Sequence, residues 1–177
     1  MPKHLQLFEK FADIENKSRL SDKITKLLNT QIKNELESSQ IYRAISCWLD
    51  DKGWIGAQKY FWKNAVEELT HMDKIYEFLF DRNVKSVVPS VGEVEKEFKD
   101  IREIVEISLD HEMKITSDWE NISEAAISEA DNTTYEFSQW FLKEQVEEEK
   151  RFRDILFKMN LEMPPYEIDE LFEELVK

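Results

Sequence analysis

Four long stretches of the sequence repeat apolar residues every three or four positions, and this pattern constrains the fold more than any other feature. The stretches cover residues 20–50, 54–81, 95–128 and 131–160. Each is near 30 residues, or roughly 40–45 Å as a helix at 1.5 Å per residue. Helices of this length favour an all-α bundle over a compact orthogonal fold.

The links between these stretches predict how the helices are arranged. The first and third links are short, so the helices that they join should be antiparallel neighbours. The middle link, residues 82–94, is longer and contains Val87-Val88-Pro89. It should run as an extended crossover between two helical hairpins. The predicted fold is therefore an all-α four-helix bundle with a long crossover between its second and third helices.

Two further segments flank the bundle, which spans residues 20–160. Residues 1–19 form a polar N-terminal extension that could hold a short helix near residues 5–14. Pro164-Pro165 stops the fourth helix, because proline cannot continue one. Residues 161–177 should then form one short amphipathic C-terminal helix.

Charge and cysteine content limit the classes of partner. The chain has 24 lysine and arginine residues against 38 aspartate and glutamate residues, a net charge of −14. No basic patch is visible, which argues against nucleic acid, whereas an acidic surface suits cations. The N-terminus has no apolar run, so we expect no signal peptide and no membrane span. Cys47 is the only cysteine, which fits a reducing compartment and predicts a cytoplasmic protein.

Each predicted helix carries a glutamate near the centre of its apolar stripe. These four acids are Glu35, Glu68, Glu112 and Glu148. Mid-helix positions meet in one plane of an antiparallel bundle, so four carboxylates should converge inside an apolar core. Carboxylates buried there must be protonated, paired or bound to metal. No lysine or arginine lies on the four inner stripes, so metal is the best candidate.

His71 strengthens the prediction of a metal site. It lies three residues after Glu68, so both side chains point to nearly the same face of the helix. Glu-x-x-His is the ligand pair of di-iron carboxylate bundles. Hard oxygen ligands with one imidazole suit iron or manganese. The other histidines, His4 and His111, are weaker candidates, and the alternative is that several of the glutamates are misphased by one residue and face water.

Four segments carry a resemblance to a known family. They are NELESSQIY (residues 34–42), EELTHM (67–72), HE (111–112) and QWFLKEQVEEEK (139–150). On these segments the chain resembles a bacterial non-haem ferritin over residues 20–160. The resemblance implies a ferritin-like bundle that oxidises Fe(II) with O2 or H2O2. It also implies a hollow shell of 24 copies of the chain that stores ferric mineral, and no haem.

The resemblance also assigns roles to individual residues. Glu35, Glu68 and His71 resemble the ligands of a first iron. Glu68, Glu112 and Glu148 resemble those of a second iron, with Glu68 bridging the two. Gln145 matches a glutamine beside the second iron, Tyr42 a tyrosine near the centre, and Trp140 a neighbouring aromatic residue. A third iron site would use Glu67, Glu144, Glu147 and Glu148, although Glu67 and Glu147 could equally be solvated surface acids.

Several other functions remain as alternatives. Bacterioferritin would have a second Glu-x-x-His on the fourth helix and a haem-ligating methionine, where this chain has Gln145-x-x-Glu148 and Leu69. A rubrerythrin-like peroxidase would need a second histidine at the site and a cysteine-rich iron domain, and the single cysteine argues against that domain. A di-iron oxidase or peroxidase without a storage shell, or a metal-binding helical scaffold without enzymatic activity, are the remaining alternatives. The long extension and the short C-terminal segment depart from the ferritin pattern and bear on shell size more than on the iron site.

Overall fold

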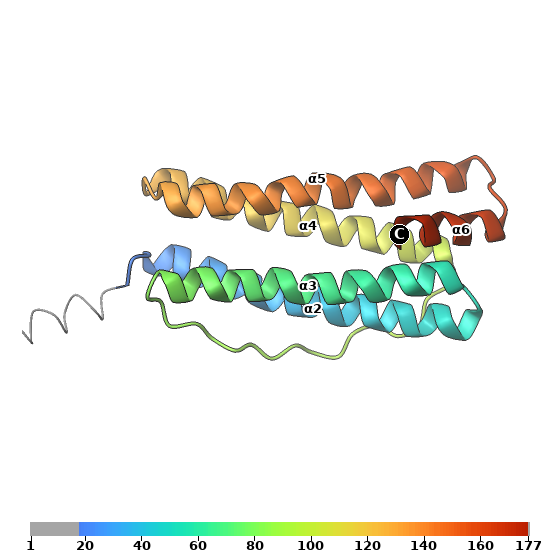
Figure 1. Cartoon of the computed structure of the whole chain (residues 1–177), viewed down its shortest axis with the longest axis horizontal. Coiled ribbons are helices and arrows are strands. Elements are labelled where there is room, and N and C mark those ends of the chain that lie inside the picture. Colours follow the sequence, from blue (N-terminus) through green and yellow to red (C-terminus); the bar gives the residue numbers. More distant parts are fainter. Residues whose placement is uncertain (1–17, 177) are drawn as a thin grey trace, which may run out of the picture.

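The computed structural model describes residues 18–176, which contain helices and turns but no strand. The helices in this part of the chain are α2 (Asp22–Lys52), α3 (Ile55–Asp81), α4 (Ile101–Ser128), α5 (Asn132–Asn160) and α6 (Pro165–Val176). Figure 1 shows α2 to α5 running along the long axis of the molecule. The predicted all-α four-helix bundle and the short C-terminal helix are both confirmed.

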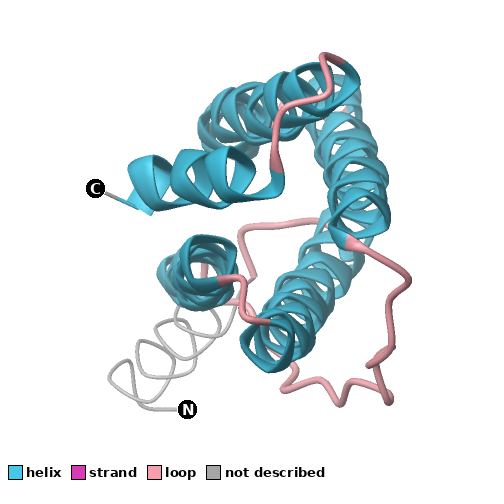
Figure 2. Ribbon diagram, turned by 90° about the vertical axis from the view of Figure 1, so that its right-hand side faces the viewer, coloured by secondary structure: helices cyan, strands magenta, loops and turns pink. Residues whose placement is uncertain are grey.

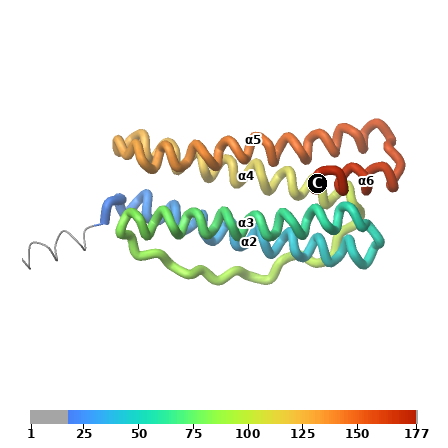
Figure 3. Tube along the Cα trace, viewed as in Figure 1, coloured from blue at the N-terminus to red at the C-terminus, as the bar shows by residue number. Residues whose placement is uncertain are grey.

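The long helices form two hairpins, α2 with α3 and α4 with α5, which pack mainly through α2 and α4. Residues 82–100 run along the outside of the bundle from the end of α3 to the start of α4 (Figure 3). Val87 fixes this crossover, because its amide donates to Asn29 Oδ1 over 2.8 Å and its carbonyl accepts from Tyr76 Oη over 3.1 Å. α3 and α4 are therefore parallel, as the long link predicts.

Capping side chains set the ends of most helices. Ser21 accepts a hydrogen bond from the amide of Ile24, and Gly53 ends α2 in the left-handed conformation with φ 79°, which glycine adopts without strain. The start predicted for the third helix, residue 95, is wrong, because α4 begins at Ile101. Asp100 has extended backbone and its carboxylate accepts from the Glu103 amide over 2.9 Å. This aspartate cap outweighs the helix-forming residues before it.

The terminal helix α6 folds back along the end of the bundle where α3 begins (Figure 2), and packs mainly against α3 and also against α5. Trp54, at the start of α3, provides no side-chain cap. Asp169 of α6 supplies it instead, accepting from the amides of Gly56 over 3.0 Å and Ala57 over 2.9 Å. A Cβ added to Gly56 would lie 2.1 Å from the Asp169 carbonyl oxygen, so this close approach requires glycine.

The apolar core is divided into two clusters. One, at the α6 end, includes Tyr60, Phe61, Phe152 and Phe172. The other lies toward the opposite end and includes Trp119, whose ring stacks on Phe141 with centroids 3.8 Å apart. The buried acids lie between these clusters in the chain order of every long helix. The packing therefore leaves a polar layer at mid-height.

Two sequence-based expectations concern the N-terminal segment and membrane spans. The short helix predicted near residues 5–14 lies outside the described residues. None of the helices within residues 18–176 combines the length and the apolar composition that crossing a bilayer would require.

Candidate metal centre

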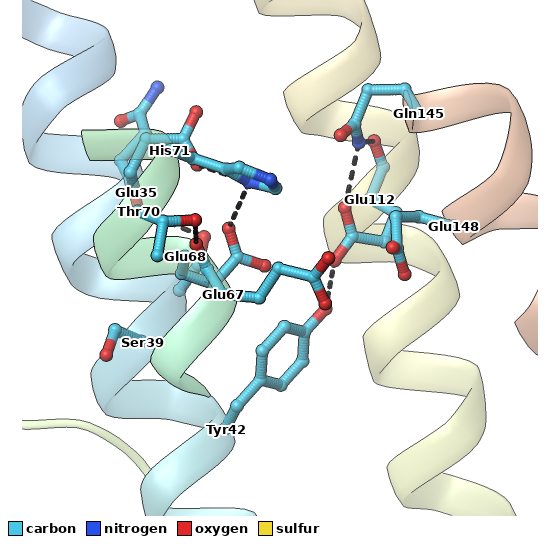
Figure 4. Close-up of polar contacts among 12 residues, drawn as sticks. Glu35, Ser39, Tyr42, Glu67, Glu68, Thr70, His71, Glu112, Gln145 and Glu148 are labelled. Atoms are coloured by element: carbon cyan, nitrogen blue, oxygen red, sulfur yellow. Dashed lines mark hydrogen bonds and ion pairs between the residues drawn. The ribbon is translucent and has the colours of Figure 1, made fainter. Parts of the chain in front are cut away.

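The polar layer contains the acids that the sequence pattern placed on the inner stripes. Figure 4 shows their side chains converging from the four long helices. All are nearly inaccessible to solvent, with exposed fractions of 1% for Glu35, 8% for Glu68, 6% for His71, 3% for Glu112 and 6% for Glu148. The alternative that these glutamates are misphased and face water is therefore wrong.

α2 and α3 supply one half of the layer. One ligand atom each from Glu35, Glu68 and His71 lies within 4.8 Å of the others. His71 Nδ1 is 3.3 Å from Glu68 Oε2 and 3.8 Å from Glu35 Oε2. Ser39 of α2 donates to the Ala65 carbonyl of α3 over 2.6 Å, which fixes the spacing of the two helices one turn away. This half has the donor set and spacing of a metal site.

α4 and α5 supply the other half. Tyr42 Oη donates to Glu112 Oε1 across the layer (Figure 4). Gln145 Nε2 donates to the other carboxylate oxygen of Glu112 over 2.8 Å. Both oxygens of Glu112 are thus oriented by neutral donors. Glu148 faces the same layer from α5 and accepts from Arg151 Nη1 over 2.5 Å.

The electrostatics of the layer are those of crowded, desolvated carboxylates. Burial raises the pKa of Glu35 well above its usual range, and the charge on Glu68 raises it further. Burial, with the charges on Glu112 and Glu148, raises the pKa of Glu68 in the same way. Burial raises the pKa of Glu112 against the hydrogen bonds from Tyr42 and Gln145. It also raises the pKa of Glu148 to about 7, against the opposing charge of Arg151.

A divalent cation would remove this repulsion. Four acids and one imidazole offer enough donors for two ions that share a carboxylate, as in carboxylate-bridged pairs about 3.5–4 Å apart. Oxygen and imidazole donors suit iron or manganese. Tyr42, whose pKa is raised by burial and by Glu112, keeps its proton and so acts as a donor toward the centre.

Aromatic rings enclose the imidazole of His71. Trp140 lies edge-on to it with centroids 5.6 Å apart, and Phe141 does so at 5.9 Å. The Trp140 ring also has Lys74 Nζ 4.2 Å from its centroid. These rings restrict the orientations open to the histidine on the side facing α5.

A second group of acids lies beside the centre. Ligand atoms of Glu67, His71 and Glu144 come within 4.8 Å of one another. Glu147 does not belong to this group; its side chain is 70% exposed, with Oε2 3.7 Å from Arg151 Nη2. The structure therefore brings together Glu67 and Glu144 of the sequence-predicted third site, and leaves Glu147 at the surface.

Several residues around the centre were not found by sequence reasoning. Gln31 is buried one turn before Glu35 and donates to its Oε1 over 2.8 Å. Tyr60 and Asn64 lie on the same face of α3 as Glu68 and are buried. The four-residue spacing of Gln31–Glu35 and Tyr60–Asn64–Glu68 is the signal that could have revealed them. Arg151 follows Glu148 by three residues but lies beside the inner stripe, so the apolar pattern does not reveal its contact with Glu148.

His111, a weaker candidate from the sequence, has a different partner. Its Nε2 is 2.7 Å from Ser38 Oγ, and its ring lies edge-on to Tyr42 with centroids 6.1 Å apart. Burial lowers the pKa of His111 to about 4, so the ring is neutral at pH 7. It joins neither of the metal-compatible groups found among the described residues.

Known proteins share much of this sequence. The model of the ferritin-like domain family matches residues 25–161, which include every residue of the centre. A probable bacterial non-heme ferritin-like protein of Haemophilus influenzae is 36% identical over 141 residues, which cover 80% of this chain and 86% of that protein. A bacterial non-heme ferritin of Escherichia coli is 32% identical over 142 residues, with 80% and 86% covered.

Solved structures agree with the sequence matches. An open pore ferritin from the archaeon Archaeoglobus fulgidus superposes with a TM-score of 0.84 at 29% identity, over 87% of this chain and 96% of that one. By its sequence and its fold, the chain belongs to the ferritin-like domain family.

Proposed function

We propose that the protein is an iron-storage ferroxidase, which oxidises Fe(II) to Fe(III) at the buried layer and holds the product as ferric mineral. One observation carries this proposal: Glu35, Glu68 and His71 are gathered within 4.8 Å in an apolar core, and Glu112 and Glu148 act electrostatically on Glu68 from the facing helices. Iron is the substrate of this centre. Membership of the ferritin-like domain family and ferritins among the relatives support the proposal.

The proposed ligand roles are those that the resemblance implies, and the two halves of the layer support them. Glu35, Glu68 and His71 bind the first Fe(II). Glu68, Glu112 and Glu148 bind the second, and Glu68 bridges the two ions. Gln145 and Tyr42 hold Glu112 in orientation through its two oxygens. Each ion loses one electron, so a pair delivers the two electrons that reduce O2 and two protons to H2O2, or H2O2 and two protons to two waters.

A third, weaker iron site is part of the proposal. It would use Glu67, Glu144 and Glu147 with Glu148 shared from the centre. The proximity of Glu67 and Glu144 supports it. These acids lie beside the layer and are more exposed than the acids of the centre. Haem plays no part in the proposal, because Leu69 stands where a haem-ligating methionine would follow the bridging glutamate.

Storage requires an enclosed space, which one bundle does not provide. We propose a closed homo-oligomer of 24 copies in the cytoplasm, with residues 20–160 as the functional bundle. The net charge of −14 would favour attraction of cations to such a shell. The ferritins among the relatives support assembly in general, and the number of copies rests on resemblance.

Aerobic addition of Fe(II), followed by stopped-flow absorbance and light scattering, tests both parts. A ferroxidase shell should oxidise Fe(II) faster than buffer and should have the mass of a large closed oligomer before and after loading. Fast oxidation by a monomer or dimer would instead indicate a di-iron oxidase without storage. A large oligomer that does not accelerate oxidation would indicate a metal-binding scaffold without enzymatic activity.

A further inference from the structure

Arg151 lies between the buried centre and the outer acids, which are Glu67, Glu144 and Glu147. It follows Glu147 by four and Glu148 by three residues on α5, so its long side chain can reach both acids. Nη1 donates to Glu148 Oε1 over 2.5 Å, and Nη2 lies 3.7 Å from Glu147 Oε2. One guanidinium therefore contacts both an acid of the centre and an acid of the predicted third site.

The wider surroundings of Arg151 are also acidic. Burial lowers the pKa of Arg151, but Glu148, Tyr60, Glu67 and Glu147 outweigh it and raise the pKa above the usual value. Three of the four acids predicted to hold a third iron thus act on this one guanidinium. The fourth, Glu144, belongs instead to the group formed with Glu67 and His71.

The Arg151–Glu148 pair differs from an ordinary surface ion pair. The side chain of Glu148 is 9% exposed and that of Arg151 is 32% exposed. Exposed pairs contribute little, whereas a charge paired inside a poorly solvated site interacts strongly with its partner. A cation that approaches Glu148 from the outer side would meet the guanidinium at close range, and the two positive charges would repel each other.

We propose that Arg151 is a built-in cation that competes with a third metal ion for Glu148 and Glu147. The inference rests on the proposed function, since it concerns the order in which ions fill this centre. Arg151 acts as a positioning residue: it holds Glu148 through Oε1 and neutralises the outer acids while no third metal is bound. An ion enters the outer site only when the guanidinium leaves these oxygens. The first two ions, which are bound from the inner side, do not displace it.

The test is anaerobic calorimetric titration of the assembled protein with Zn(II), a redox-inert probe, and then with Fe(II). The variants are Arg151→Leu, which removes the charge, and Arg151→Lys, which keeps it. Arg153→Leu is the matched control, because Arg153 is 51% exposed and pairs with Glu149 over 2.6 Å, away from the centre. Anomalous diffraction from Zn(II)-soaked crystals locates the bound ions.

We expect two tight sites per chain in every variant. A third site near Glu67, Glu144 and Glu147 should bind at least about ten-fold tighter in Arg151→Leu than in the wild type, in the range of couplings between close charges. Arg151→Lys and Arg153→Leu should stay near the wild-type value. If Arg151→Leu does not assemble, Arg151→Gln keeps a polar side chain and gives the same comparison.

The outcomes separate this inference from the proposed function. A third-site affinity in Arg151→Leu that equals the wild-type value would overturn the competition and leave Arg151 as a structural ion pair. A gain over the wild type that is equally large in Arg151→Leu and Arg153→Leu would also overturn it, since such a gain would reflect net charge alone. If the wild type and Arg153→Leu bound no ion in the central layer, the proposed function itself would fail.

Discussion

Glu67 and Glu68 are adjacent in the sequence but lie in different environments, as do Glu147 and Glu148. Glu68 and Glu148 are 8% and 6% exposed, while Glu67 is half-buried and Glu147 is exposed. One residue along a helix turns the side chain by about 100°. That step separates Glu68 from Glu67 and Glu148 from Glu147. The inner acids are Glu35, Glu68, Glu112 and Glu148, and the outer acids are Glu67, Glu144 and Glu147.

The comparison shows that burial, rather than the number of acids, defines the centre. The inner acids are surrounded by apolar side chains of two core clusters, so they cannot be neutralised by water and salt. They must hold protons or cations. The outer acids retain access to solvent, and Arg151 already faces some of them. Binding of metal should therefore be strong at the inner acids and conditional at the outer ones.

The largest expected difference is in the rate of Fe(II) oxidation between alanine variants at the adjacent positions 68 and 67. Glu68→Ala should slow rapid Fe(II) oxidation by about 100-fold or more, because loss of a bridging ligand damages both ion sites. The fold should persist, and the metal-free protein should gain stability as repulsion falls. Stopped-flow absorbance measures the rate and circular dichroism the fold. Glu67→Ala is the matched control and should keep most of the rate; a folded Glu68→Ala protein with wild-type speed would contradict the bridging role.

The second largest effect should be a pH dependence of stability that is caused by the inner acids. Glu148 has its pKa raised from 4.5 to about 7, so the folded state binds a proton more tightly than the unfolded state. The stability that Glu148 contributes to the metal-free protein should thus be fully present below pH 4.5 and be lost as the pH rises toward 7. Glu148 alone should contribute a loss of about 3 kcal/mol, or about 6–12 °C in Tm.

Thermal unfolding with a chelator at pH 5, 6, 7 and 8 tests this dependence. Glu148→Gln should flatten the fall in Tm, whereas Glu147→Gln should not. Saturating Zn(II) should stabilise the protein more at pH 8 than at pH 5, because metal and protons compete for the same oxygens. The same change in Tm between pH 5 and 7 in the wild type and in Glu148→Gln would contradict the raised pKa of Glu148.

A smaller effect should follow from the residue that orients Glu35. Gln31→Leu removes the donor to Glu35 Oε1, and loss of such an outer contact weakens metal binding by about 10–100-fold. Calorimetric titration with Zn(II) under anaerobic conditions measures the affinity of the first site. Thr30→Ala, one residue away and exposed, serves as the control. Unchanged affinity in Gln31→Leu would mean that Glu35 is oriented by its metal alone.

The smallest effect on early oxidation should come from the outer acids. The double variant Glu144→Ala with Glu147→Ala should still bind two ions per chain and oxidise Fe(II) within about three-fold of the wild-type rate, because exposed charges interact weakly. The ratio of iron oxidised to oxygen consumed and the onward movement of Fe(III) should change. An oxygen electrode and Mössbauer spectroscopy measure these. Loss of the first two ions from this double variant would show that the outer acids are needed to bind ions at the centre.

The sequence was sufficient to predict the inner acids because burial and helical period coincide there. Each of Glu35, Glu68, Glu112 and Glu148 replaces an apolar residue on an otherwise regular stripe. The start of α4 was predicted too early, because the residues before Ile101 favour helix and the dominant cap of Asp100 depends on its own backbone geometry.

Arg151 and Gln31 were missed for a different reason. Their importance lies in the atoms that they contact, Glu148 Oε1 and Glu35 Oε1, and helical spacing gives only the side of the helix. The sequence also could not predict the partner of Glu147, since the choice between a metal ion and Arg151 depends on distances of a few ångströms. Contacts made by long polar side chains can therefore be assigned only from a structure.

The cap that Asp169 provides for α3 imposes an order on events during synthesis. Asp169 follows Gly56 by 113 residues, so a growing chain makes all of α3 long before its first amides have their acceptor. Until α6 emerges, those amides face water, and Tyr60 and Phe61 lack the ring of Phe172 that later lies within 6 Å of them. The hairpins that carry the buried acids can form earlier from nearby segments. Closure of the α6 end therefore waits for the synthesis of α6 and follows the folding of α3.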